Sequence, residues 1–258
     1  MRSAALASLC AVAMLAATDP SMAINNGSPD GNAHPAVGWI IGTDPDLDNC
    51  SGSNQLFTSA CSAVLLAPDV LLTSSRCVNA FQNGLNSGLV DELWLILAEN
   101  PFSGTSFDCT QFRDIDETQL HAASAPVSSL GIMLLSIPVT DVTPAALPTE
   151  DLLHSIPPRP NSLTFVGFNP VDGQSIISLR RRSATGRTQP PLQTEIQEVQ
   201  LQSPAGASIS EYDEGGATFV GATNQIVSML RSTVPPNLLQ RLDTPAARAF
   251  LGQFVTLP

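Results

Sequence analysis

The stretch Cys61-Ser-Ala-Val-Leu-Leu-Ala-Pro-Asp-Val-Leu-Leu-Thr-Ser-Ser-Arg76-Cys77 contains two short apolar runs that are separated by a Pro-Asp pair. Short runs rich in Val, Ile, Leu and Thr, divided by Gly, Pro, Asn or Asp, are typical of strands in sandwiches and barrels. The sequence therefore predicts an all-β protein. Similar runs recur along the chain, at Val37–Gly42, Leu93–Leu97, Leu130–Leu135, Leu163–Gly167, Ile176–Leu179, Ala217–Val220 and Ile226–Leu230.

Two segments depart from this strand pattern. Pro144 to Pro160 contains five prolines, which predicts a linker that crosses between two halves of the protein. Asp243 to Leu251 begins with a good N-cap residue and carries proline in its first turn. It is the one segment for which the sequence predicts a helix.

The N-terminus has the features of an export signal, which we assign to residues 1–23. Arg2 supplies a positive charge, and the apolar run Ala4–Ala17 is too short to span a membrane. Small residues offer cleavage after Ala17 or after Ala23. No later stretch is long and apolar enough to predict a membrane span, so we expect a secreted or periplasmic protein.

The charge of the chain restricts its partners. The formal net charge is −12, and all eleven basic residues are arginine. An acidic chain without basic clusters is a poor candidate for nucleic acid or for an anionic membrane surface. One short exception, Arg180-Arg181-Arg182, could form a basic patch. We favour a solvated strand edge or loop, because edge strands often carry charge that opposes aggregation.

The segment Cys61–Cys77 resembles the histidine-bearing strand and loop of trypsin-like, chymotrypsin-fold serine proteases. In that family the residue before the second cysteine is the general-base histidine, and here it is Arg76. Ser129 precedes a strand that is similar to the family's Asp-Ile-Ala-Leu strand, and it takes the place of the orienting aspartate. Tyr212-Asp213-Glu214-Gly215-Gly216 is similar to the family's Gly-Asp-Ser-Gly-Gly loop, with Glu214 in the place of the nucleophile.

The resemblance covers nearly the whole mature chain and is nearest to bacterial members. The residues that carry it elsewhere are Ile24-Asn-Asn-Gly27, His34-Pro35, Val166-Gly167-Phe168 and Arg241–Leu251. It implies two six-stranded antiparallel Greek-key β-barrels followed by a C-terminal α-helix. Barrel one is expected at about 24–143, the linker at 144–160, and barrel two with the helix at 161–258. It also implies that His34 lies in a surface turn.

The three replacements remove the family's usual chemistry. Serine attack needs a neighbouring base of near-neutral pKa, and an arginine cannot accept the proton. Ser129 carries no charge with which to orient an imidazole, and the carboxylate of Glu214 is a poor nucleophile for an amide. We therefore expect no catalytic residues and predict a protein that binds a protein or peptide ligand. The alternatives are an active secreted serine endopeptidase, a carboxylate-based hydrolase and a structural extracellular module.

The substrate-binding positions implied by the resemblance also depart from the family. In the oxyanion loop, which spans Tyr212, Asp213, Glu214 and Gly215, Tyr212 replaces a glycine that donates an N–H to the oxyanion. Ser228 and Leu230 lie on a segment that resembles the substrate-pairing strand, and Leu230 replaces a glycine that keeps the specificity pocket open. Ser208 falls near the expected base of this pocket.

The resemblance to trypsin-like proteases also suggests two charge pairs. Cleavage after Ala23 would make Ile24 the N-terminus, whose amine would pair with Asp213 as in activated proteases. The alternative is that Asp213 is an ordinary turn residue. Arg76 and Glu214 would face each other across the old catalytic cleft and could form a bidentate salt bridge. Otherwise each side chain points into solvent.

The cysteines fit an exported protein. Four remain after removal of the signal, and an even number favours disulfides outside the cytoplasm. The resemblance pairs Cys61 with Cys77, which leaves Cys50 and Cys109 as the remaining pair. We exclude a metal site because the chain has no C-x-x-C pair and no histidine beside a cysteine. No cofactor is expected.

Overall fold

The computed structural model describes residues 24, 27–43, 59–103, 106–169, 179–202, 207–210, 213–232 and 237–258. Four of the predicted features lie wholly or partly outside the described residues: the export signal at 1–23, residues 176–178 of the strand predicted at Ile176–Leu179, the pairing of Cys50 with the side chain of Cys109, and Tyr212. In the described part of the chain, no helix is both long and apolar enough to cross a membrane.

Six antiparallel strands close into barrel one in the order β2-β3-β4-β9-β8-β5. The strands are β2 (Val37–Thr43), β3 (Ser59–Ala67), β4 (Val70–Ser74), β5 (Glu92–Ile96), β8 (Phe112–Ala122) and β9 (Leu130–Leu135). The pair β6 (Phe102–Ser103) and β7 (Ser106–Phe107) and the short helix η1 (Cys109–Gln111) lie between β5 and β8. All five residues of β4 are buried, because α1 and the second barrel cover the face that does not point into barrel one.

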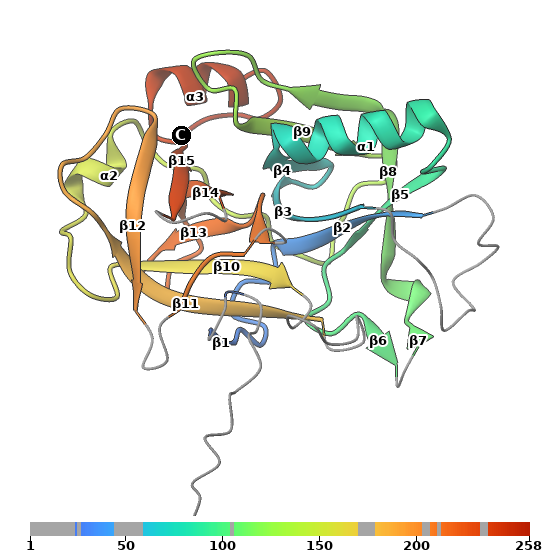
Figure 1. Cartoon of the computed structure of the whole chain (residues 1–258), viewed down its shortest axis with the longest axis horizontal. Coiled ribbons are helices and arrows are strands. Elements are labelled where there is room, and N and C mark those ends of the chain that lie inside the picture. The colour runs from blue at the N-terminus through green and yellow to red at the C-terminus, as the bar shows by residue number, and fades with distance from the viewer. Residues whose placement is uncertain are drawn as a thin grey trace, which may run out of the picture.

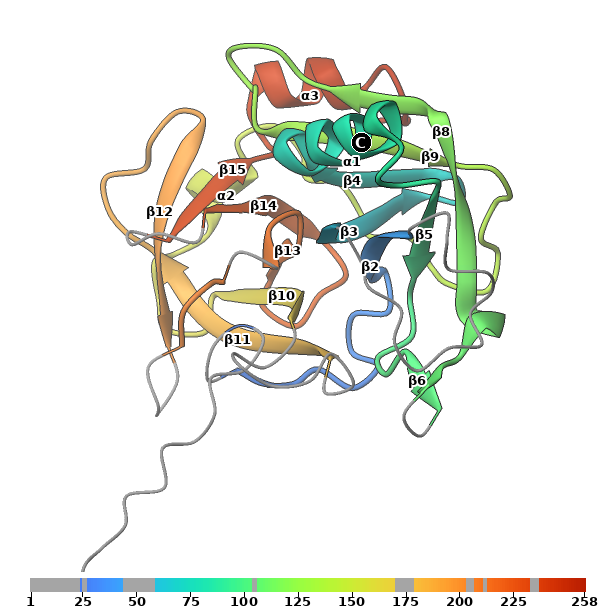
Figure 2. The ribbon, with the colours of Figure 1, turned by 45° about the vertical axis from the view of Figure 1, so that its right-hand side comes forward.

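Barrel two also has six strands, in the order β11-β10-β13-β14-β15-β12, and a pairing between β11 and β12 closes it. These strands are β10 (Leu163–Asn169), β11 (Arg180–Thr188), β12 (Ile196–Gln202), β13 (Ala217–Val220), β14 (Ile226–Ser232) and β15 (Leu238–Arg241). Figure 2 shows this ring beside barrel one. The predicted all-β fold of two six-stranded barrels is confirmed.

The two ends of the chain cross over to the opposite barrel. The short strand β1 (Ser28–Pro29) pairs with β11, and Ile24 packs in the core of barrel two. The predicted C-terminal helix is present as α3 (Pro245–Leu251), and it packs against the core of barrel one (Figure 1). These exchanges tie the barrels together.

A buried ion pair between Arg241 and Asp243 anchors the start of α3. Arg241 binds both carboxylate oxygens of Asp243, at 2.9 and 3.0 Å. The same carboxylate accepts the backbone N–H of Leu153 in α2 (Leu152–Ser155), a single helical turn within the expected linker. The linker is thereby fixed to the beginning of the C-terminal helix.

The helix α1 (Ser75–Ser87) was not predicted from the sequence. The Ser74 hydroxyl caps its N-terminus by accepting the N–H of Cys77, and Gly88 in the left-handed conformation ends it. Cys77, Val78 and Phe81 form its buried face against barrel one. This helix places Arg76 in its first turn, at the junction between the barrels.

The interpretation of Arg180-Arg181-Arg182 as solvated is wrong for its central residue. Arg181 is fully buried, and its Nε lies 3.2 Å from Asp30 Oδ2. Its Nη1 donates to the carbonyl oxygens of Val37 and Leu97 in barrel one, at 3.0 and 2.9 Å. Because side chains alternate along β11, Arg181 faces away from the core of barrel two, into which Ala184 packs. Arg181 therefore points toward barrel one and spans the interface between the barrels.

His34 is also buried, which corrects its expected place in a surface turn. Its Nδ1 lies 2.7 Å from Asp30 Oδ1, and its ring packs on Phe219 with centroids 4.3 Å apart. Burial opposes ionisation of Asp30, but the hydrogen bond and charge of His34 and the charge of Arg181 outweigh it. The pKa of Asp30 therefore lies below its ordinary value.

The substitution Asp30→Asn should destabilise the protein strongly, because it removes the ion-pair partner of the buried Arg181 charge. We expect a loss of about 3–5 kcal/mol in the free energy of unfolding, measured by urea denaturation. The control is Asp141→Asn, which breaks the solvent-exposed pair with Arg113 and should cost less than about 1 kcal/mol. Equal small losses in both variants would contradict the role given to Arg181.

Candidate functional site between the two barrels

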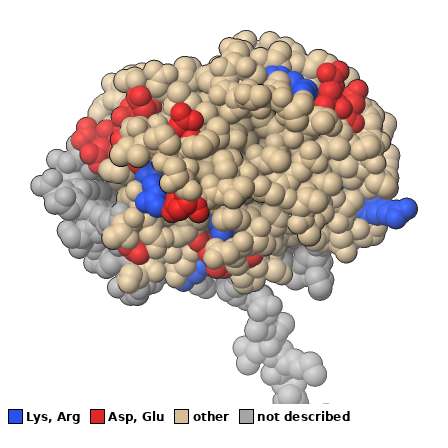
Figure 3. Space-filling model, turned by 180° about the vertical axis from the view of Figure 1, so that it is seen from behind, with Lys and Arg blue, Asp and Glu red and all other residues tan. Residues whose placement is uncertain are grey.

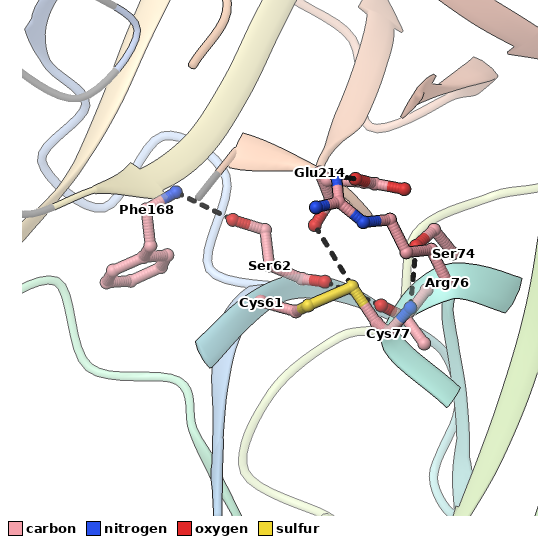
Figure 4. Close-up of a disulfide and its surroundings, with 8 residues drawn as sticks. Cys61, Ser62, Ser74, Arg76, Cys77, Phe168 and Glu214 are labelled. Atoms are coloured by element: carbon pink, nitrogen blue, oxygen red, sulfur yellow. Dashed lines mark hydrogen bonds and ion pairs between the residues drawn. A yellow bond between two sulfur atoms is a disulfide. The ribbon is translucent and has the colours of Figure 1, made fainter. Parts of the chain in front are cut away.

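The disulfide between Cys61 and Cys77 joins strand β3 to the first turn of α1 and is confirmed. The neighbouring Ser62 reaches across to barrel two. Its hydroxyl accepts the N–H of Phe168 at 2.8 Å, and its own N–H donates to the carbonyl of Glu214 at 3.0 Å. Figure 4 shows the contact between Ser62 and Phe168 beside the disulfide. The disulfide and the two contacts of Ser62 together bring α1 against the loop that contains Glu214.

The loop at 213–216 takes a conformation that requires glycine. Gly215 has a φ of +90°, and a Cβ atom there would collide with the Ser62 carbonyl and the Thr73 hydroxyl. The Gly215 N–H donates to the carbonyl of Leu230 at 3.0 Å. The loop is therefore held closely between both barrels, and the position of Glu214 is fixed by its backbone.

Arg76 and Glu214 meet at this junction. Arg76 Nη1 lies 3.1 Å from Glu214 Oε2, while 70% of the Arg76 side chain and 7% of the Glu214 side chain are exposed. This is a single contact, whereas we expected a bidentate one. The arginine therefore covers a buried carboxylate from the solvent side.

Burial raises the pKa of Glu214 above its ordinary value. A hydrogen bond with Ser74 and the charges of Arg76 and Arg231 act in the opposite direction without cancelling this effect. Arg231 follows directly after the predicted pocket residues, and we did not single it out from the sequence. The signal that could have revealed it is a charged residue in an otherwise apolar strand that leads toward the cleft.

Ser129 lies beside the helix N-terminus that carries Arg76. Its side chain is nearly buried, and its carbonyl accepts the N–H of Ser75 at 2.9 Å. The position therefore contributes a backbone contact to the start of α1. It brings no charge to the site.

The backbone N–H of Ile24 lies 3.2 Å from each carboxylate oxygen of Asp213, which is fully buried. The backbone N–H and the hydroxyl of Ser210 also donate to this carboxylate, both at 2.8 Å. In the uncleaved chain, Ile24 follows Ala23, so its donor is a peptide N–H. The geometry nevertheless brings together the two residues of the expected N-terminal pair.

The expected pocket residues are placed in the barrel interior. Ser228 and Leu230 are fully buried, and Leu230 packs in the core of barrel two beside Ile24. The N–H of Leu230 donates to the carbonyl of Gly216 at 2.8 Å, so it is occupied within the sheet. Ser208 is half-buried and precedes Ile209, which belongs to the same core.

The three histidines of the chain contact groups outside this site. His34 binds Asp30, His121 packs on Phe254, and His154 lies 3.3 Å from Asp151. Among the described residues, no three His, Cys, Asp or Glu side chains gather as metal ligands would. The groups assembled at the junction are therefore two arginines, a buried carboxylate and hydroxyls, without an imidazole base.

The architecture and the site together define a trypsin-like, chymotrypsin-type fold, and solved structures of this class are similar to the chain. One is the scabies mite inactivated protease paralogue S-I1, at 16% identity and a TM-score of 0.58, covering 89% of this chain and 97% of that one. HL collagenase is 13% identical with a TM-score of 0.59, over 88% and 96% of the two chains. GrC is 14% identical with a TM-score of 0.58, also over 88% and 96%.

These likenesses establish the fold alone, because the identities are low. No family model and no curated protein matches the sequence.

The substitution Glu214→Gln should change how stability depends on pH. Because the pKa of Glu214 is raised in the folded state, the folded protein binds more protons than the unfolded chain just above the ordinary value of 4.5. Ionisation of Glu214 therefore lowers stability as the pH rises through this window, and Glu214→Gln removes that loss. Urea unfolding at a series of pH values should show the variant gaining relative to the unmodified protein above pH 4.5 and levelling off beyond the folded pKa. A difference that is constant with pH would contradict the raised pKa.

Proposed function

We propose that this is an extracytoplasmic, non-catalytic protein of trypsin-like fold that acts by binding a protein or peptide. The observation that carries the proposal is the ion pair between Arg76 and Glu214, at the positions where the resembling family has its base and nucleophile. A guanidinium stays protonated at physiological pH and cannot take a proton from an attacking group. Its partner carboxylate is buried and engaged.

Among the residues that the structure describes at this junction, we identify no replacement for a serine mechanism. The hydroxyl of Ser210 donates to Asp213, and no histidine contacts it among the interactions described. Ser129 supplies no negative charge. Since nucleophilic attack by serine depends on an adjacent base, the arrangement favours binding over hydrolysis.

Two further observations support the proposal without testing it. One structure of similar fold is named as an inactivated protease paralogue, so this architecture is compatible with loss of catalysis. The Cys61–Cys77 disulfide and the signal-like N-terminus agree with an oxidising compartment outside the cytoplasm.

The first test is incubation of the purified mature protein with a diverse peptide mixture, read by mass spectrometry beside Glu214→Ala. We expect no cleavage above the buffer control in either sample. The raised pKa of Glu214 is the observation that favours the alternative of a carboxylate-based hydrolase. Cleavage that disappears in Glu214→Ala would establish that alternative and overturn the proposal. Cleavage that is equal in both samples would call for a serine-directed probe to separate another nucleophile from a contaminant.

We further propose that export processing after Ala23 converts the Ile24 contact with Asp213 into an ammonium–carboxylate pair that orders the loop. Mass spectrometry of the exported protein should give Ile24 as its first residue. Asp213→Asn should then cost about 3–5 kcal/mol in the free energy of unfolding, because a buried charge loses its partner. A folded mature protein that begins at Thr18 would contradict this proposal.

A further inference from the structure

The outer wall of barrel one carries an apolar hollow of about 530 Å³. Its lining includes Trp94 of β5 and Phe112 of β8, whose ring centroids lie 5.9 Å apart, together with Ile137, Pro138 and Val139 from the segment after β9. The Ile137 side chain is 72% exposed, the highest value among the large apolar side chains of the described residues. Apolar surface of this kind, gathered at a hollow, is typical of interaction sites.

A second hollow of about 510 Å³ adjoins the first. Its apolar lining comes from Pro35, Leu97 and Val142. The two hollows share Arg113 and Asp141 in their linings, and these side chains form an ion pair at 3.3 Å. Because the side chains of Arg113 and Asp141 are 35% and 65% exposed, their ion pair contributes little to stability and can open at small cost. The two hollows can therefore act as one extended groove.

Carboxylates surround this groove. Asp114 lies opposite Trp94 in the pairing of β5 with β8, and it lines the first hollow. Glu92 lies two residues before Trp94 on β5, so it belongs to the same outer face. Figure 3 views the molecule from behind and shows several carboxylates toward its left edge, the side on which β5 and β8 lie at the right of Figure 1. The rim is therefore predominantly negative, with Arg113 as the exception.

We propose that this groove docks an extended, basic segment of a partner protein. An apolar side chain of the partner enters the hollow formed by Trp94, Phe112 and Ile137, while Lys or Arg residues beside it pair with Asp114 and Asp141. The proposal deepens the binding function proposed above, on which it rests, by naming the surface and the chemistry of the ligand.

Charge complementarity decides between possible occupants. A second copy of this chain, with its net charge of −12, would bring like charges together across the acidic rim. An anionic membrane would be repelled for the same reason. A basic segment with an apolar anchor satisfies both the hollow and its rim, and electrostatic attraction would also speed its association.

The chain contains an internal reporter for this test. It has two tryptophans, of which Trp39 is 1% exposed in the core and Trp94 lines the groove. The probe is a short synthetic peptide in which Arg alternates with Leu, titrated against the folded mature protein. A matched peptide carries Glu in place of every Arg. We expect the basic peptide to shift the tryptophan emission and to lose affinity as salt is raised, and we expect no binding of the acidic peptide.

Two pairs of variants locate the binding. Ile137→Ser should weaken affinity about tenfold, equivalent to about 1.4 kcal/mol, whereas Leu89→Ser should leave it unchanged. Leu89 is the matched control because it is the other exposed large apolar residue, at 61%, and does not line the groove. Asp114→Asn should weaken binding and reduce its salt dependence, while Glu150→Gln, an exposed carboxylate in the linker, should not.

The outcomes separate this proposal from the one on which it rests. Absence of binding, equal binding of both peptides, or equal effects of Ile137→Ser and Leu89→Ser would each overturn the groove as a basic-segment site. Self-association in sedimentation experiments that Ile137→Ser abolishes would also overturn it and make a second copy the occupant. Mass spectrometry of the peptide after titration addresses the other question, because cleavage would overturn the non-catalytic function even where binding is found.

Discussion

One buried guanidinium holds the two barrels of this protein in register. Arg181 belongs to barrel two, yet it donates to the carbonyls of Val37 and Leu97 in barrel one and pairs with Asp30 in the N-terminal segment. Its Nη2 also donates to the carbonyl of Gly31. A buried charge is costly unless its partners satisfy it, so these groups cannot separate without a large loss of stability. A lysine could not replace it, because a single ammonium cannot reach acceptors that diverge in this way.

The junction held in this way is built from a backbone frame and from the side chains that this frame positions. The disulfide, the backbone contacts of Ser62 and the glycine at position 215 still place the α1 terminus against the 213–216 loop. Within this frame Arg76 covers the carboxylate of Glu214. The contacts that build the frame come from the disulfide, from backbone groups and from a glycine, so they do not depend on the side chains of Arg76 and Glu214.

Several strands and the C-terminal helix could be predicted because each depends on a local pattern of apolar residues and caps. Strands β8, β11 and β12 could not, because their many polar and charged residues do not form apolar runs. Helix α1 could not, since its many Asn, Ser and Gly residues are weak helix formers and its stability comes from packing Val78 and Phe81 on barrel one. Arg181 and His34 were misassigned because their burial depends on contacts with residues far along the chain, Asp30 for Arg181 and Phe219 for His34. The electrostatic contribution of Arg231 to Glu214 arises only when the 213–216 loop folds against strand β14.

The contact between Ile24 and Asp213 has a chemical consequence in a chain whose basic residues are all arginine. Without lysine, a mature protein beginning at Ile24 would contain a single primary amine, and that amine would be its buried N-terminus. Acylating reagents, carbonyl compounds and amine-directed crosslinkers would find no target on the folded surface. The protein would become reactive toward them only on unfolding, so its resistance to such modification would itself measure how firmly the N-terminus is held.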